Sequence, residues 1–172
     1  VQPGGLTSTA LIFAGTAAGI DVATEVPQSR WGALPEELLS LLGKATEQRT
    51  RHGAFVCGAD LFDNSHFAIS PAEAQAADPQ HRLVLEHGYA ALKDAGHTKT
   101  MLLGSDIGVA VGIYATEFAQ VIATGPLACS VYANTGSSLS VACGRLSFVL
   151  GLHGPCASFE TACSASLVAC HS

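Results

Sequence analysis

The arrangement of apolar positions predicts strands that alternate with helices along most of the chain. A continuous run of small apolar residues over 107–113 predicts a strand that is buried on both faces. Residues 137–150 carry apolar side chains at helical spacing and are followed by Gly151, a common helix stop. Residues 157–161 predict a second strand. Alternation of this kind indicates an α/β architecture.

Capping residues mark two helix starts in the middle of the chain. The sequence SPAE at 70–73 is a capping box with proline at the first helical position, and it predicts a short helix to residue 77. Asp78 and Pro79 begin the next helix, which Gly96 ends. The apolar positions of that helix recur at spacings that predict a buried stripe: Leu83, Val84, Leu85, Tyr89, Leu92 and Ala95.

The first third of the chain is less regular. We expect a helix over 6–19, a loop over 21–31, a short helix over 35–43 and a short strand over 53–57. One further helix is predicted later in the chain, over 116–123.

Composition narrows the class of protein. The chain has 172 residues, enough for one domain with a core, and 48% of them are hydrophobic against 13% charged, which excludes a disordered chain. The net charge is −6 with no basic run, so nucleic acid is not an expected partner. No apolar stretch has the length of a membrane span. The chain starts at Val1 and its first basic residue is Arg30, so we expect an internal fragment without a signal peptide.

Six cysteines raise the alternatives of a disulfide framework and of free thiols. They are Cys57, Cys129, Cys143, Cys156, Cys163 and Cys170. Most of them lie in apolar runs and no secretory signal is visible, so free thiols in a reducing compartment, cytosol or plastid, are the better interpretation.

The segment 157–172 carries the candidate chemistry. Cys163 follows a short predicted strand with almost no loop, opens a predicted helix and has only small residues on either side. A sharp strand–turn–helix junction projects such a side chain out of the turn, as in a nucleophile elbow. The helix start favours the reactive thiolate, and the Cys163 N–H is placed to donate to an oxyanion. Cys163 is therefore the best nucleophile of the six.

Two other interpretations stay open for this segment. Free cysteine is among the most buried residue types, so Cys163 is alternatively a small core residue. His153, Cys156, Cys163, Cys170 and His171 also lie close together in sequence, but their spacings are not the close pairs of structural zinc sites, so no metal is expected.

Several motifs of this chain resemble those of the β-ketoacyl synthase (ketosynthase) family. The segment ETACSASLVA at 160–169 is similar to the family signature DTACSSSLVA, and GRLSFVLGLHGP at 144–155 is similar to GRLSYVLGLQGP. Further matches, in chain order, are EVP and RW within 25–31, RHG at 51–53, FD at 62–63, FAISP and EA within 67–74, and DPQ, RL and LE within 78–86. They follow family order and spacing, and are most like the type I polyketide synthase branch.

The resemblance implies a thiolase-like α/β fold, of which residues 1–172 would be the first, N-terminal half, with a mixed sheet and helices on both faces. It also implies a homodimer that works with an acyl carrier protein and with other domains of a multidomain synthase for polyketides or fatty acids. No cofactor is expected in the domain itself, because the substrate is carried on phosphopantetheine.

The implied activity is that of an acyltransferase, a condensing enzyme. Cys163 would accept an acyl group from a carrier-protein thioester for decarboxylative condensation with malonyl-carrier protein, which gives a 3-oxoacyl thioester. The family also uses two histidines in its second half, beyond Ser172, so this stretch alone is expected to be inactive. The alternative is a non-catalytic remnant that dimerises or holds an acyl chain.

This sequence departs from the family motifs at a few positions. Glu160 replaces the usual Asp, Ala72 an Arg, and His81 a Gln, while His66 and Ala68 stand where an aromatic residue and Gly are common. None of these changes removes the candidate nucleophile.

Overall fold

A computed structural model describes residues 3–6, 8–27, 30, 41 and 44–172. The helix predicted over 35–43 falls almost entirely outside the described residues. The chain divides into two compact units, Val1–Gly58 and Ala59–Ser172, which are treated separately below.

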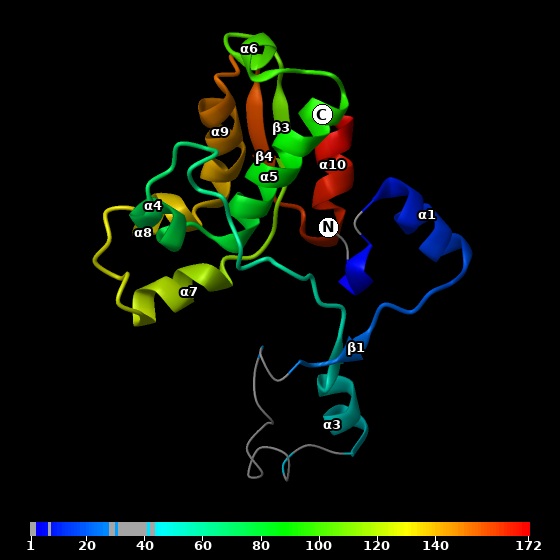
Figure 1. The fold of residues 1–172 in the computed structure, drawn as a ribbon. Coiled ribbons are helices and arrows are strands. Elements are labelled where there is room, and N and C mark those ends of the chain that lie inside the picture. Colours follow the sequence, from blue (N-terminus) through cyan, green and yellow to red (C-terminus); the bar gives the residue numbers. More distant parts are fainter. Residues whose placement is uncertain (1–2, 7, 28–29, 31–40, 42–43) are drawn as a thin grey trace. The chain divides into compact units, whose positions relative to one another are not determined.

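The first unit has little regular structure (Figure 1). Its elements in chain order are η1 (Pro3–Gly5, a 3₁₀ helix), α1 (Thr9–Ala17), β1 (Thr24–Glu25), α3 (Lys44–Thr50) and β2 (His52–Gly53). The predicted first helix is confirmed in a shorter form, because Ser8 caps it by accepting a hydrogen bond from the Leu11 N–H at 3.2 Å.

The strands of the first unit form an antiparallel pair in which Thr24 faces Gly53. The predicted loop therefore contains a two-residue strand, and the predicted strand over 53–57 is paired only at its first residue. Arg30 fixes the chain after β2: its guanidinium lies 5.9 Å from the centre of the Phe55 ring and donates to the carbonyl of Val56.

The second unit holds the α/β layers. Its elements in chain order are α4 (Pro71–Ala76), α5 (Pro79–Asp94), α6 (Lys99–Leu102), β3 (Val109–Gly112), α7 (Glu117–Thr124), α8 (Ala133–Ser137), α9 (Leu139–Leu150), β4 (Cys156–Phe159), η2 (Ala162–Ser164, a 3₁₀ helix) and α10 (Ala165–His171).

The capping predictions for α4, α5 and α9 are confirmed. Ser70 Oγ accepts from the Glu73 N–H at 3.1 Å, and Asp78 Oδ1 accepts from the Gln80 N–H at 2.8 Å. Gly151 ends α9 with φ of 67°, a left-handed conformation that glycine adopts without a Cβ clash.

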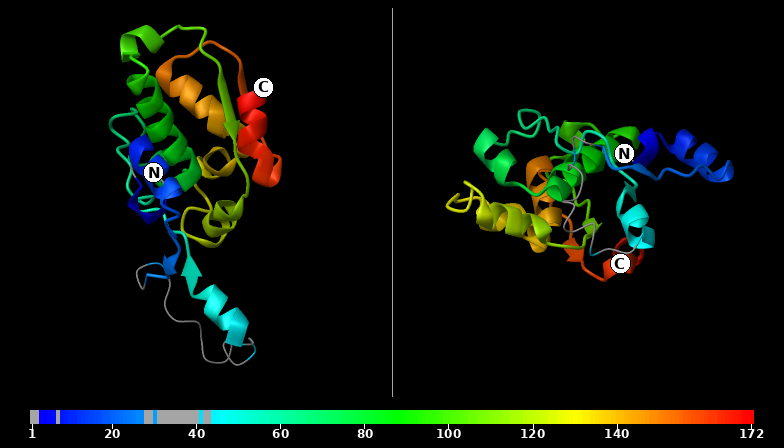
Figure 2. Two further views of the ribbon diagram at one scale, coloured as in Figure 1. Left: turned by 90° about the vertical axis from the view of Figure 1, so that its right-hand side faces the viewer. Right: turned by 90° about the horizontal axis from the view of Figure 1, so that it is seen from below.

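The two central strands are parallel, with Val109 opposite Cys156 and Gly112 opposite Phe159. α9 and α10 pack against this pair from opposite sides, as the two views of Figures 1 and 2 show. The expected helices on both faces are therefore present. Among the described residues, the strands form two separate two-stranded sheets, this parallel pair and the antiparallel pair of the first unit. A mixed sheet, in which parallel and antiparallel strands lie side by side, is therefore not present in the described residues.

β3 is shorter and less buried than expected. The sequence predicted a strand over 107–113 that is buried on both faces, but the strand covers Val109–Gly112 and Ala110 is exposed. The difference from the prediction arises because the sheet has two strands here. In such a pair each strand has one unpaired edge, so its faces and edges cannot all be buried.

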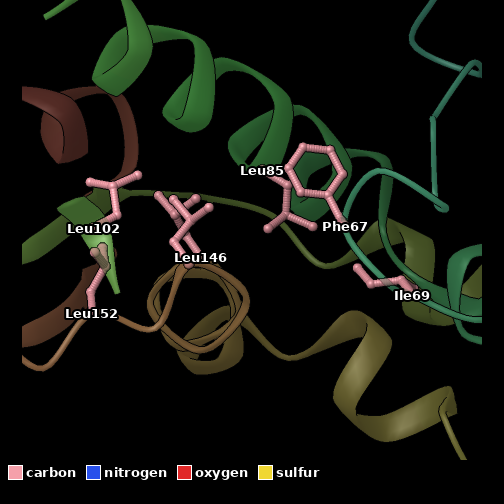
Figure 3. Packing of buried hydrophobic residues seen from close by; sticks show 7 residues of the cluster. Phe67, Ile69, Leu85, Leu102, Leu146 and Leu152 are labelled. Carbon is pink, nitrogen blue, oxygen red and sulfur yellow. The ribbon is translucent and has the colours of Figure 1, made fainter. Parts of the chain in front are cut away.

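The core of the second unit lies between α5, α9 and the parallel strands (Figure 3). Its buried members include Leu85 of α5 and Leu146 of α9, which are 1% and 6% exposed. The other buried members are Phe67, Ile69, Leu102, Leu150 and Leu152. Leu85 and Leu146 thus bring α5 and α9 together, and this packing holds the strands in place. The predicted stripe of α5 is only partly buried, because Ala95 lies just after the helix and is exposed, and the remaining members are half-buried: Leu83, Val84, Tyr89 and Leu92.

Candidate active site

Cys163 lies in a one-turn 3₁₀ helix between β4 and α10. The predicted strand ends at Phe159, two residues earlier than expected, and α10 begins at Ala165, two residues after the cysteine. Cys163 therefore does not open the α-helix itself, as the sequence analysis expected. It occupies the tight junction between strand and helix.

The turn that presents Cys163 is sharp. Ala162, the residue before it, has φ of 51°, in the left-handed region that is unfavourable by roughly 1–2 kcal/mol for a residue with a Cβ. Strained backbone of this kind persists only where surrounding contacts hold it. The abrupt strand–turn–helix geometry that the small neighbours of Cys163 predicted is therefore present.

Ser164 ties the turn to Thr161, the second residue after the strand. Its hydroxyl donates to the Thr161 carbonyl at 2.8 Å and lies 3.1 Å from Thr161 Oγ1. Its N–H donates to the same Thr161 carbonyl at 3.2 Å. These contacts close a loop around Ala162 and Cys163, so the backbone that carries the thiol is held on both sides.

A backbone hydrogen bond joins the end of β3 to the strand that leads into the junction. The N–H of Ile113 donates to the Phe159 carbonyl at 3.0 Å, which fixes the end of β4 against the end of β3. Ala165, the first residue of α10, is buried, whereas Cys163 itself is exposed. The buried side of the junction anchors it, and Cys163 lies on its exposed side.

The six cysteines, all of which the structure describes, are free thiols, and Cys143 alone among them is buried. Cys156 is exposed as a residue, but partial desolvation of its thiol raises its pKa, the neighbouring Cys143 thiol raises it further, and the Ser147 hydroxyl opposes the shift. A raised pKa keeps Cys156 protonated and therefore a poor nucleophile. The proximity of Cys143 and Cys156 was not foreseen, because they are far apart in sequence.

The metal alternative gains no support from the placement of its residues. In the part of the chain that the structure describes, no three His, Cys, Asp or Glu side chains are grouped closely enough to hold a metal ion.

The described part of the chain also contains no helix with the length and apolar character needed to cross a membrane.

An apolar cavity of about 410 Å³ lies along β3, and sequence analysis missed it. Residues 107–112 line one side, and Val84, His87 and Leu92 of α5 line another. Cys163 is not among its lining residues, so the cavity and the candidate nucleophile are separate features. No sequence signal marks it, because most of its walls are half-buried or exposed apolar positions of α5 and β3 that come together only in the fold.

A buried polar cluster was also missed. Arg145 of α9 is 7% exposed, forms an ion pair with Glu73 of α4, and donates to the Thr135 carbonyl at 3.4 Å. His81, 1% exposed, lies near Arg145. The signal that could have found the cluster is a lone arginine in the otherwise uncharged helix predicted over 137–150.

Comparison with known proteins agrees with the motifs. Residues 2–172 match the family model described as "Beta-ketoacyl synthase, N-terminal domain". The chain is 37% identical over 169 residues to a mycocerosic acid synthase-like polyketide synthase of Mycolicibacterium smegmatis, and 44% identical over 172 residues to the phenolphthiocerol synthesis polyketide synthase Pks15/1 of Mycobacterium bovis. Each match covers 98% of this chain but only 8% of the relative.

Solved structures give the same result for the fold. The ketosynthase from module 6 of the bacillaene synthase of Bacillus subtilis 168 superposes with a TM-score of 0.77 at 28% identity, and the match covers 99% of this chain and 26% of the ketosynthase. An oxazolomycin ketosynthase domain from Streptomyces albus JA3453 gives 0.77 at 27% identity, with 99% and 29% covered. The expected α/β, thiolase-like fold is confirmed by these similarities, and the chain belongs to the β-ketoacyl synthase family, whose N-terminal domain it matches.

Proposed function

We propose that these residues are the N-terminal part of a ketosynthase domain in a polyketide synthase, and that Cys163 is its acyl-accepting nucleophile. The observation that carries the proposal is the placement of Cys163: an exposed thiol on a sharp, clamped turn between a parallel strand and a helix, within the segment that resembles the family signature. The substrates are carrier-protein thioesters, and the domain needs no resident cofactor.

The reaction proceeds by covalent catalysis, which splits one difficult transfer into two steps. In the first step the Cys163 thiol gives up its proton and the thiolate attacks the thioester carbonyl carbon. A new sulfur–carbon bond forms, the bond from that carbon to the phosphopantetheine sulfur breaks, and the phosphopantetheine leaves as a thiolate that takes up a proton in place of the one lost by Cys163. In the second step malonyl-carrier protein loses carbon dioxide, and the resulting carbanion attacks the acyl carbon. The Cys163 sulfur leaves as thiolate, and the product is a 3-oxoacyl thioester.

The partners follow from the same proposal. The domain acts on an acyl carrier protein, pairs as a homodimer and is joined to other synthase domains. The family's two histidines, which polarise the malonyl carbonyl and support decarboxylation, would be supplied by the second half of the domain. The assay therefore uses the complete condensing domain that contains residues 1–172.

The first test is acylation of that domain by an acyl N-acetylcysteamine thioester, followed by intact-mass measurement. We expect one acyl group per chain, which Cys163→Ala abolishes. Cys170→Ala is the matched control, because Cys170 is also exposed and lies near the other end of α10. This substitution should leave acylation unchanged. An acyl group that persists in Cys163→Ala would contradict the proposal.

A second measurement separates the enzyme from a non-catalytic remnant. When malonyl-carrier protein is added to the acylated domain, an active ketosynthase releases carbon dioxide and forms a 3-oxoacyl-carrier protein. A remnant that only holds acyl chains would keep the acyl group on Cys163 and release neither product.

A further inference from the structure

The end of β3 and the first turn of α10 touch backbone to backbone. A Cβ atom placed on Gly112 would lie 2.5 Å from both the carbonyl carbon of Ala165 and the nitrogen of Ser166, and 2.6 Å from the Ala165 oxygen. These distances are far below van der Waals contact, and main-chain atoms cannot rotate out of the way as a flexible side chain can. α10 reaches its position only because residue 112 has no side chain.

This contact is mechanically connected to the candidate nucleophile. The N–H of Ala165 donates to the carbonyl of Ala162, so the start of α10 and the turn before it form one hydrogen-bonded unit. Ser164 fastens the other side of that turn to Thr161. A displacement of Ala165 away from β3 would therefore carry Cys163 with it.

We propose that Gly112 is a positioning residue, whose backbone contact with the first turn of α10 sets the place of the Cys163 sulfur relative to a bound thioester. The inference rests on the proposed function of Cys163. Acyl transfer requires the nucleophile within about 3–3.5 Å of the carbonyl carbon and correctly aligned, and a misplacement of about 1 Å reduces the rate roughly 100-fold. Alkylation of an exposed thiol by a small reagent has no such requirement.

The test is Gly112→Ala in the complete condensing domain, with two rates measured at Cys163. We expect acylation by the N-acetylcysteamine thioester to fall roughly 30- to 100-fold. Alkylation by iodoacetamide should change by less than about threefold, because that reagent approaches a thiol from many directions. The ratio of the two rates is the readout, since a merely structural role would not change it.

Gly88→Ala is the matched control. A Cβ on Gly88 would lie 2.7 Å from Leu146 Cδ2, so the substitution crowds the same core but meets a flexible side chain, away from Cys163. We expect it to lower the melting temperature while leaving the ratio of acylation to alkylation within about twofold of the wild-type value. A similar fall of the ratio in both variants would overturn the proposal.

Ala165→Gly keeps the proposal testable if Gly112→Ala fails to fold. It keeps the main-chain contact with Gly112, removes the buried methyl group of Ala165 and gives the backbone at that position more conformational freedom, so it loosens the first turn of α10 without introducing a clash. We expect the ratio to fall, and a ratio equal to that of the wild type in a folded Ala165→Gly or Gly112→Ala variant would refute the assignment.

Failure of the proposed function itself looks different. If the wild-type domain is not acylated, or if acylation persists in Cys163→Ala, then the nucleophile has been misassigned and the positioning role falls with it. If wild-type acylation depends on Cys163 but not on Gly112, only the positioning role is wrong.

Discussion

His81 is a residue whose surroundings oppose its charged form. It lies in the first turn of α5 and is 1% exposed. Burial lowers its pKa below the ordinary value of 6.5, and the nearby positive charge of Arg145 lowers it further, whereas Asp78 and the backbone of Ser138 act in the opposite direction. The imidazole is therefore held neutral at pH values where an unfolded chain would bind a proton.

This shift makes stability depend on pH in a defined direction. Above pH 6.5 His81 is neutral in both states, and its burial carries no protonation penalty. As the pH falls below 6.5, the unfolded state binds a proton that the folded state does not, so the free energy of unfolding decreases by up to about 1.4 kcal/mol per pH unit. We expect urea unfolding of the domain to show a free energy of unfolding that declines as the pH falls below about 6.5.

His81→Gln should remove that pH dependence while keeping a polar side chain of similar length. His153→Gln alters an exposed histidine and serves as the control, which should retain the wild-type slope. If the difference between pH 7 and pH 5 were the same in His81→Gln as in the wild type, His81 would not be its source.

Residues whose role depends on local chemistry could be predicted from sequence, and those that act through tertiary contacts could not. Ser70, Asp78 and Gly151 were assigned correctly, because a cap or a left-handed stop depends on the adjacent backbone. The left-handed Ala162 and the contact made by Gly112 depend on how β3 and α10 meet, which no local pattern encodes.

At the scale of elements, α8 shows why short helices escape sequence analysis. Its sequence, ANTGS, contains mostly residues with low helix propensity, and no helix was predicted there. Tertiary contact compensates: a Cβ on Gly136 would lie 2.0 Å from the Ala76 carbonyl oxygen, and the Asp78 N–H donates to the Gly136 carbonyl at 2.7 Å. Main-chain contacts of Gly136 thus hold α8 against the end of α4.

The ion pair of Arg145 with Glu73 joins α9 to α4, and its contact with Thr135 adds α8. Glu73→Ala should destabilise the domain by roughly 1–3 kcal/mol, because it leaves a buried guanidinium without its counter-charge. The value is below that for a fully buried pair, since Glu73 is 28% exposed. Denaturant unfolding measures the change.

A double-mutant cycle with Arg145→Met separates the pair from other effects of each substitution. Once Arg145 is replaced by an apolar residue, removal of Glu73 should have a much smaller effect on the free energy of unfolding. Strictly additive changes would show that the two helices are not coupled through this pair.

At the scale of the whole molecule, several large apolar side chains of the second unit are exposed to solvent. Phe148 of α9 is 87% exposed and Val131 is 86% exposed, and Leu103 and Leu167 are similar. Exposed apolar groups of this size often mark interaction surfaces. The chain spans about a quarter of the solved ketosynthases that it matches.

We therefore expect residues 59–172, produced alone, to bind an apolar fluorescent dye and to self-associate in size-exclusion chromatography. The double substitution Phe148→Ser with Val131→Ser should reduce both effects, while the complete condensing domain should show little of either. A monomeric unit that does not bind the dye would contradict this expectation.

The parallel pairing of β3 with β4 has a consequence for biosynthesis. Val109 is opposite Cys156, so α7, α8 and α9 must all be made before the second strand of the pair exists. At a translation rate of about 5–20 residues per second, β3 waits several seconds on the ribosome with its hydrogen-bonding edges unpaired. The turn that carries Cys163 follows β4 in the chain, so it cannot form until the second strand of the pair has been made.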